Sequence, residues 1–134
     1  MTKSQNMNTP IKWYSINKNL SVVEHDVVQK EEAYRIVDEY FSKLKNFYET
    51  GEDAIAETMF GFQKSKSEFI EICIHGDTHI SFKYEVKKPV KILFFNVPKV
   101  IQAERRLHSK EELKTMVSSF YDLGSDEYLS HARR

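Results

Sequence analysis

The stretch FIEICIHGDTHISFKYEV, residues 69–86, decides the fold because apolar and polar residues alternate along both of its halves. Such alternation is typical of β-strands with one buried face. A two-residue turn would mix the two faces, whereas a three-residue loop from Gly76 to Thr78 keeps one face apolar. This register also places Glu71 opposite Lys83, an attractive cross-strand pair. We therefore predict a hairpin whose buried face carries Ile70, Ile72, Ile74, Ile80, Phe82 and Tyr84.

Two amphipathic helices are expected on either side of this hairpin. Apolar residues recur every three or four positions over residues 30–48, which predicts an early helix there. A late helix is expected over residues 109–121, because Ser109 and Glu112 have the spacing of a capping box.

Further strands are expected in the segments between and beside these helices. The candidates are IKWYSI at 11–16, ETMFGFQ at 57–63, and VKILFFNV at 90–97. The last of them is almost entirely apolar, which favours a central strand, or one covered on both faces, that is closed by Pro98. The final residues, DEYLSHARR at 126–134, are expected to form a short strand or a turn. In the strand ETMFGFQ, Gly61 lacks a side chain to pack and indicates the close approach of a neighbour.

This order of elements predicts an α+β fold. A single antiparallel sheet of about four to six strands would pack against the early and late helices. The sequence has no internal repeat and no linker. We therefore expect a flexible tail over residues 1–10 and one domain over residues 11–134.

Composition excludes several classes of protein. The chain has 134 residues, of which 40% are hydrophobic and 30% charged, a balance that argues against a disordered chain. Its one cysteine, Cys73, cannot form an internal disulfide or a cysteine-rich zinc module. No apolar run approaches the roughly 20 residues that a membrane span needs, and residues 1–10 have no apolar leader core. A cytoplasmic protein without a membrane partner is expected.

The net charge is zero, but its distribution along the chain is uneven. Residues 21–60 carry ten acidic and four basic side chains, whereas residues 61–110 carry ten basic and five acidic ones. A domain-wide basic excess, the usual mark of a nucleic-acid-binding protein, is absent. We therefore expect no direct nucleic-acid binding, and a surface with one acidic and one basic region.

The hairpin loop carries the residues that most resemble a catalytic or metal site. In the predicted register, His75 and His79 face each other on the side away from the core, with Asp77 between them. A catalytic zinc site needs three convergent ligands with supporting contacts, and the other histidines have no matching spacing. Cys73 lies two residues from His75 on the same outer face, so an imidazolium-assisted thiol is the alternative. We expect no cofactor and no metal.

The order of the elements resembles that of a family of bacterial immunity proteins, which are encoded beside polymorphic or contact-dependent toxins, including deaminase toxins. The matching pieces cover about residues 30–130: EEAYRIVDEYFSKL, ETMFGFQ, FIEICIHGDTHISFKYEV, VKILFFNV and SKEELKTMVSSFYDLGSDEYLSHA. The family's last helix ends in an aromatic pair before a glycine, as FYDLG does at residues 120–124, and a short aromatic strand follows. That strand commonly holds a proline and a tryptophan, and residues 125–131 hold neither.

The resemblance implies a protein that is not an enzyme and that binds and blocks one cognate toxin domain. The alternative is a small-ligand-binding or hydrolytic α+β domain that uses Cys73, His75 and His79. The two differ in that an inhibitor needs a charged contact surface, whereas an enzyme needs a concave pocket with convergent polar groups.

A toxin that acts on nucleic acids has a basic cleft, so an acidic contact surface is expected on its inhibitor. Acidic candidates lie in three places: after the early helix, at the tip of the predicted hairpin, and at the end of the late helix. A tyrosine could supply the aromatic anchor that interfaces favour. The partner-binding candidates are Glu49, Glu52, Asp53, Glu57, Asp77, Tyr121, Asp122 and Asp126, with Tyr48 as a second aromatic choice. The basic stretch 83–110 is the alternative contact region, and it would imply an acidic toxin.

Overall fold

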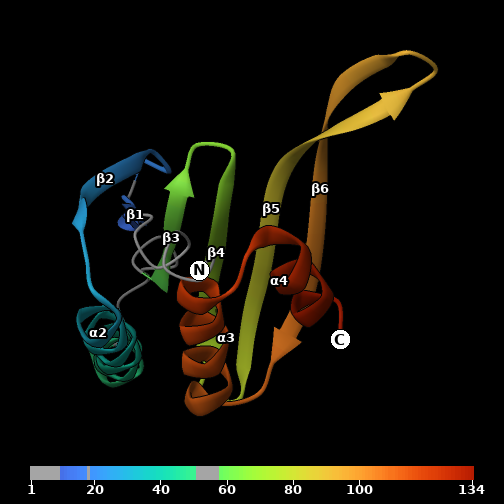
Figure 1. The fold of residues 1–134 in the computed structure, drawn as a ribbon. Coiled ribbons are helices and arrows are strands. Elements are labelled where there is room, and N and C mark those ends of the chain that lie inside the picture. The colour runs from blue at the N-terminus through green and yellow to red at the C-terminus, as the bar shows by residue number, and fades with distance from the viewer. Residues whose placement is uncertain (1–9, 18, 51–57) are drawn as a thin grey trace.

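In a computed structural model, residues 10–17, 19–50 and 58–134 are described. These residues form an α+β fold, in which one open antiparallel sheet of six strands in the order β2-β1-β3-β4-β5-β6 carries three helices (Figure 1). The strands are β1 (Lys12–Ile16), β2 (Val22–Val27), β3 (Met59–Ser65), β4 (Glu68–Gly76), β5 (His79–Ile92) and β6 (Phe95–Leu107). The helices are α2 (Lys30–Thr50), α3 (Lys110–Asp122) and α4 (Ser125–Ala132). Of the predicted tail, only Pro10 belongs to the described residues.

The predicted register of the β4–β5 hairpin is confirmed. Ile70 pairs with Tyr84, Ile72 with Phe82, and Ile74 with Ile80. All six residues of the predicted apolar face are at most 2% exposed: Ile70, Ile72, Ile74, Ile80, Phe82 and Tyr84.

The predicted three-residue loop of this hairpin is wrong in detail. Gly76 pairs with His79, so the connection itself is the two residues Asp77 and Thr78. The register shifts between Ile74 and Gly76, and this bulge supplies the extra residue that keeps the isoleucines on one face.

All three helices cover that apolar face. Tyr40 of α2 stacks on Phe60 of β3, with ring centroids 4.1 Å apart. Tyr84 lies edge-on against Phe120 of α3 and Tyr128 of α4, at 6.2 and 4.8 Å. Figure 1 shows the helices together on one side of the sheet, and no helix of the described residues lies on the other side.

The outer face of the sheet carries charged residues together with Phe69, Cys73 and Tyr14, and Tyr14 crosses Gly61. Lys83 lies opposite Glu71, and their charged atoms are 3.9 Å apart, as the register predicted. The Tyr14 hydroxyl donates a hydrogen bond to the carbonyl oxygen of Ile70 at 2.9 Å, across the backbone of Gly61. A Cβ atom at Gly61 would lie 2.2 Å from that oxygen, so the predicted close approach of a neighbour is confirmed.

Both predicted helices are present. The early helix extends from Lys30 to Thr50, slightly beyond the predicted range of 30–48. The late helix is capped as predicted, since the Ser109 side chain accepts a hydrogen bond from the backbone N–H of Glu112 at 3.0 Å. The Glu112 carboxylate reaches back to the N–H of His108 rather than to that of Ser109.

Two predictions about the second half of the chain are wrong. Residues 90–97 are neither central nor covered, because they form the far end of the long β5–β6 hairpin, and Pro98 lies inside β6 opposite Pro89. Residues 125–132 form helix α4, whereas a strand or turn was expected from the sequence and from the family resemblance. Helix α4 forms because Tyr128 and Ala132, four residues apart, bury one helical face against the sheet.

We expect Gly61→Ala to lower the free energy of unfolding by about 1–3 kcal/mol, because the new methyl group overlaps the Ile70 carbonyl oxygen and the Tyr14 ring. Chemical denaturation followed by circular dichroism measures this change. The matched control is Gly76→Ala, since nothing lies within 4 Å of a Cβ at Gly76. Equal stability of the two variants would contradict the packing of Tyr14 over Gly61.

Candidate functional site

The most exposed apolar surface of the described residues lies on a two-stranded arm, defined here as residues 87–100. Its strands continue β5 and β6 past the sheet, and Figure 1 shows it projecting beyond the helices and the other strands. We call residues 92–95 the tip of the arm and the rest its shaft. Six large apolar side chains of the arm have exposed fractions of 39 to 91%: Ile92, Leu93, Phe94, Phe95, Val97 and Val100. Large exposed apolar patches on folded proteins mark interaction sites.

The turn at the tip contains residues that a tight hairpin turn normally excludes. Ile92 pairs with Phe95, so Leu93 and Phe94 form a two-residue turn. Leu93 has φ 58°, a backbone conformation that favours glycine because of its missing Cβ. A large apolar residue in a strained conformation, with its side chain 81% exposed, contributes nothing to the core. Such local conflicts are found at functional sites.

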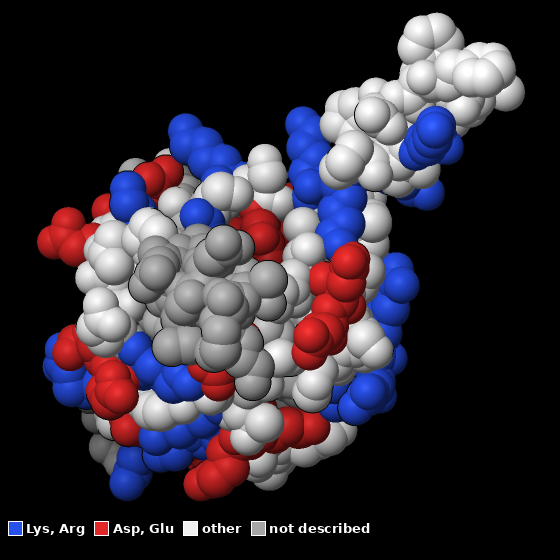
Figure 2. All heavy atoms as spheres, in the orientation of Figure 1, with Lys and Arg blue, Asp and Glu red and all other residues white. Residues whose placement is uncertain are grey.

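The shaft of the arm is basic. It carries four lysines and no acidic residue: Lys87, Lys88, Lys91 and Lys99. Figure 2 shows the lysines along the shaft and the uncharged tip beyond them. The arm therefore combines an apolar tip with a positively charged shaft.

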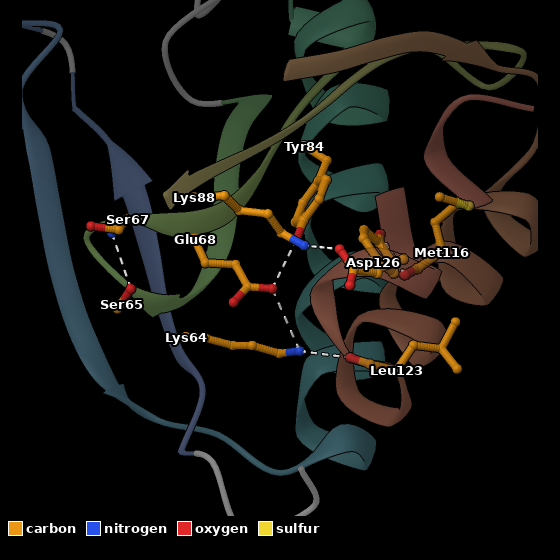
Figure 3. Close-up of polar contacts among 10 residues, drawn as sticks. Lys64, Ser65, Ser67, Glu68, Tyr84, Lys88, Met116, Leu123 and Asp126 are labelled. Carbon is orange, nitrogen blue, oxygen red and sulfur yellow. Dashed lines mark hydrogen bonds and ion pairs between the residues drawn. The ribbon is translucent and has the colours of Figure 1, made fainter. Parts of the chain in front are cut away.

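A polar network anchors the base of the arm to the junction of α3 and α4 (Figure 3). The Tyr84 hydroxyl donates to the Glu68 carboxylate at 2.8 Å, and Lys64 lies 3.8 Å from the same oxygen. The Lys64 ammonium also donates to the carbonyl oxygen of Leu123 at 2.9 Å. On the arm itself, Lys88 forms an ion pair with Asp126, the second residue of α4.

The inner part of this network is withdrawn from water, whereas the Asp126 side chain at its outer end is 92% exposed. Those of Lys64 and Glu68 are 9% and 19% exposed. Burial lowers the pKa of Lys64, and the Glu68 charge opposes this only in part. Burial also raises the pKa of Tyr84, and the Glu68 carboxylate adds to that shift, so the hydroxyl keeps its proton and remains the donor. The network ties β3, β4 and β5 to the helices beside the base of the arm.

The predicted acidic candidates do not gather into one surface in the described part of the chain. Glu52, Asp53 and Glu57 lie outside the described residues, and Glu49 and Tyr48 lie in α2, where their side chains are not described. Of the other candidates, Asp122 forms an ion pair with Lys30 at 2.7 Å, and the Asp126 carboxylate is bound by the arm lysine.

The two remaining candidates lie apart from each other. The Tyr121 hydroxyl donates to the carbonyl oxygen of Val28 at 2.9 Å, so this half-buried side chain helps to hold α3. Asp77 is exposed in the β4–β5 turn. The acidic contact surface remains a prediction.

The histidines and cysteine of the hairpin are close, but their environment does not activate the thiol. The rings of His75 and His79 lie 4.7 Å apart, and His75 Nε2 is 2.9 Å from the Ser81 hydroxyl. Cys73 is half-buried 3.9 Å from the Thr58 hydroxyl, and burial raises the pKa of its thiol. A raised pKa leaves less thiolate at neutral pH, the opposite of what a nucleophile requires.

The surroundings of Cys73 form an open depression on the outer face of the sheet. It is lined by Glu71, Cys73, Ser81, Phe82, Lys83, Glu104, Arg105 and Arg106. Across the described residues, no three His, Cys, Asp or Glu side chains are placed to hold a metal ion. Partial desolvation lowers the pKa of His79, and the nearby Arg106 and His75 lower it further.

None of the described helices combines the length and apolar character that crossing a bilayer requires.

The sequence predicted the wrong environment for the arm, because the apolar run ILFF at 92–95 is typical of a buried strand. No sequence pattern marks Lys64, Glu68 and Lys88 as the residues at its base. One pattern could have revealed the arm. Lysines and prolines flank the apolar run symmetrically, and the register indeed pairs Lys88 with Lys99 and Pro89 with Pro98.

We expect Cys73 to react with iodoacetamide several-fold more slowly at pH 7.5 than in the urea-unfolded chain, because burial raises its pKa and restricts access. Mass spectrometry over time measures the rate, and the rate should rise as the pH approaches and passes the raised pKa. Reaction faster than in the unfolded chain would indicate an activated thiol and favour the hydrolytic alternative.

Comparisons of the chain with protein-family models, with curated proteins and with solved structures give no match.

Proposed function

We propose that this chain is an immunity protein: it binds a cognate bacterial toxin domain in the cytoplasm and blocks it, without catalysis of its own. The observation that carries the proposal is the exposed apolar tip of the arm, with Phe94 91% and Leu93 81% exposed. Side chains of this size reach their full binding energy only when a partner removes them from water.

The form of the arm supports a binding function rather than a structural one. Its backbone is held by β-ladder pairs from Lys87 with Val100 up to Ile92 with Phe95, and its base is held by the Lys88–Asp126 ion pair. A contact element that is ordered before binding loses little conformational entropy in the complex. The order of elements from the early helix to the late helix, which resembles that of immunity proteins, supports the same function.

The hydrolytic alternative receives less support from the same geometry. Its residues lie at an exposed turn and in an open depression, and the pKa of Cys73 is shifted away from that of a nucleophile. An enzyme needs convergent groups around a place where a substrate can be held. The arm, by contrast, has a shape that fits insertion into another molecule.

We expect the chain to protect cells from the product of the gene adjacent to its own. Co-expression should restore growth that the neighbouring product alone arrests, and the two proteins should purify as a complex. With the partner at about 100 times its Kd, binding should stabilise the fold by about 2.7 kcal/mol and raise its melting temperature by about 10 °C.

The control in this experiment is an unrelated protein expressed at the same level from the same vector. A neighbouring product that forms no complex with the chain, or that arrests growth equally with and without it, would contradict the proposed function.

A further inference from the structure

We propose that the arm lies in an elongated acidic cleft of its protein partner, with Leu93 and Phe94 filling an apolar pocket at the inner end of the cleft. The inference rests on the proposed function and adds to it the chemistry of the surface that is bound. Three observations lead to it: the extent of the apolar surface along the arm, the sign of its charge, and the strand pairing that continues to its tip.

The apolar surface of the arm is too long for insertion of the tip alone, and it lies on both faces of the ribbon, so a membrane surface does not bury it. A β-ribbon rises about 3.3 Å per residue, so Val100 lies about 20 Å behind the tip. Elements at the interface are buried by about 5–10 Å, so a ribbon that entered tip first would bury only its tip. A ribbon that lay flat would bury one face, and Val97 and Val100, three residues apart in β6, point to opposite faces. A lipid surface could therefore not cover both of these side chains, which are 39% and 50% exposed. A cleft in a protein can cover the tip and the shaft together.

The charge of the shaft requires an acidic lining in the cleft. Within the part of the chain that the structure describes, Lys88 is the one arm lysine with an ion-pair partner, Asp126. Lys87, Lys91 and Lys99 are exposed, and no acidic residue lies between positions 87 and 100. Lysines that enter a cleft lose part of their hydration, and carboxylates on the partner offset that loss and accelerate the encounter.

A second copy of the chain is a poorer fit than an acidic protein. Two arms placed side by side would bring eight lysines together, which repel each other. The attachment of the arm points to one defined partner. The β-ladder extends to Ile92 and Phe95, so the backbone that carries the tip is ordered up to the two-residue turn at Leu93 and Phe94.

The test replaces the tip without damaging the hairpin. In the full chain, Leu93→Gly with Phe94→Asn removes both apolar side chains and places glycine where φ is positive, a sequence that a two-residue turn accepts well. The melting temperature should stay equal or rise. We expect the affinity for the co-purified partner, measured by surface plasmon resonance, to fall by about 100-fold or more.

The matched control for this variant is Leu20→Gly. Leu20 is also a leucine with positive φ, at 63°, and is 72% exposed, but it lies in the β1–β2 connection at the other end of the sheet. Its substitution should leave the affinity unchanged. An equal loss in both variants would overturn the assignment of the tip as the contact.

The sign of charge in the cleft is tested separately. Lys91→Glu with Lys99→Glu should slow association by about tenfold at low salt, and the difference should shrink as salt is added. Lys45→Glu, at an exposed position of α2, is the control and should have little effect. Faster association of the arm variant would overturn the acidic cleft and indicate a basic partner surface.

The outcomes separate this inference from the proposed function. If the tip variant neutralises and binds the toxin as the wild type does, the inference fails while the immunity function stands. If the wild type binds no product of the neighbouring gene, both fail. If the wild type sediments with vesicles of phosphatidylcholine and phosphatidylglycerol and the tip variant does not, the arm is a membrane contact and the protein cleft is overturned.

Discussion

The antiparallel pairing of β4 with β5 determines which side of the sheet is apolar, and every helix of the described chain depends on that choice. The pairing turns Ile72, Phe82 and Tyr84 to the same side, where α2, α3 and α4 lie. A slip of one residue would turn these side chains to water and present Glu71 and Lys83 to the helices. Antiparallel sheets tolerate one uncovered face, so the outer side needs no second layer of helices. The helices cover only part of the length of β5 and β6, and the far ends of these two strands extend past them.

Much of the fold could be predicted from sequence because its central elements have strong periodicity. Alternation over residues 69–86 specified both strands and their register, and three- and four-residue spacing specified the two longer helices. Where the periodicity was weak, prediction failed. Strand β2 was not expected, since its residues Val22–Val27 are mostly exposed and their pattern is not that of a half-buried strand. Helix α4 has only eight residues, and its pattern extends over barely two turns.

The candidate site was harder to predict, because an apolar strand buried in a sheet and an apolar strand presented to a partner have the same composition. Residues 90–97 would satisfy either environment. The two environments differ in whether a neighbouring strand or helix covers the apolar residues. That depends on the length of β5 and β6 and on the positions of the helices. The anchoring network was also beyond sequence reasoning, since Lys64, Tyr84 and Asp126 come together only through the tertiary fold. The predicted acidic positions follow from charge counts alone, and charge counts do not show that Lys30 and Lys88 occupy two of them.

The lysines of the shaft have a second consequence, which concerns the protein before it meets any partner. Beyond the sheet, both edges of the ribbon present backbone N–H and C=O groups beside apolar side chains, an arrangement that invites edge-to-edge aggregation. Charged residues and prolines are the usual protection for such an edge, and the arm has both: Lys88 is paired with Lys99 and Pro89 with Pro98. The prolines cannot donate to an added strand, and the lysines repel another arm. The lysines proposed to select the partner thus also protect the arm against self-association. Replacing them with neutral polar side chains would both weaken the selection of the partner and favour the formation of fibres.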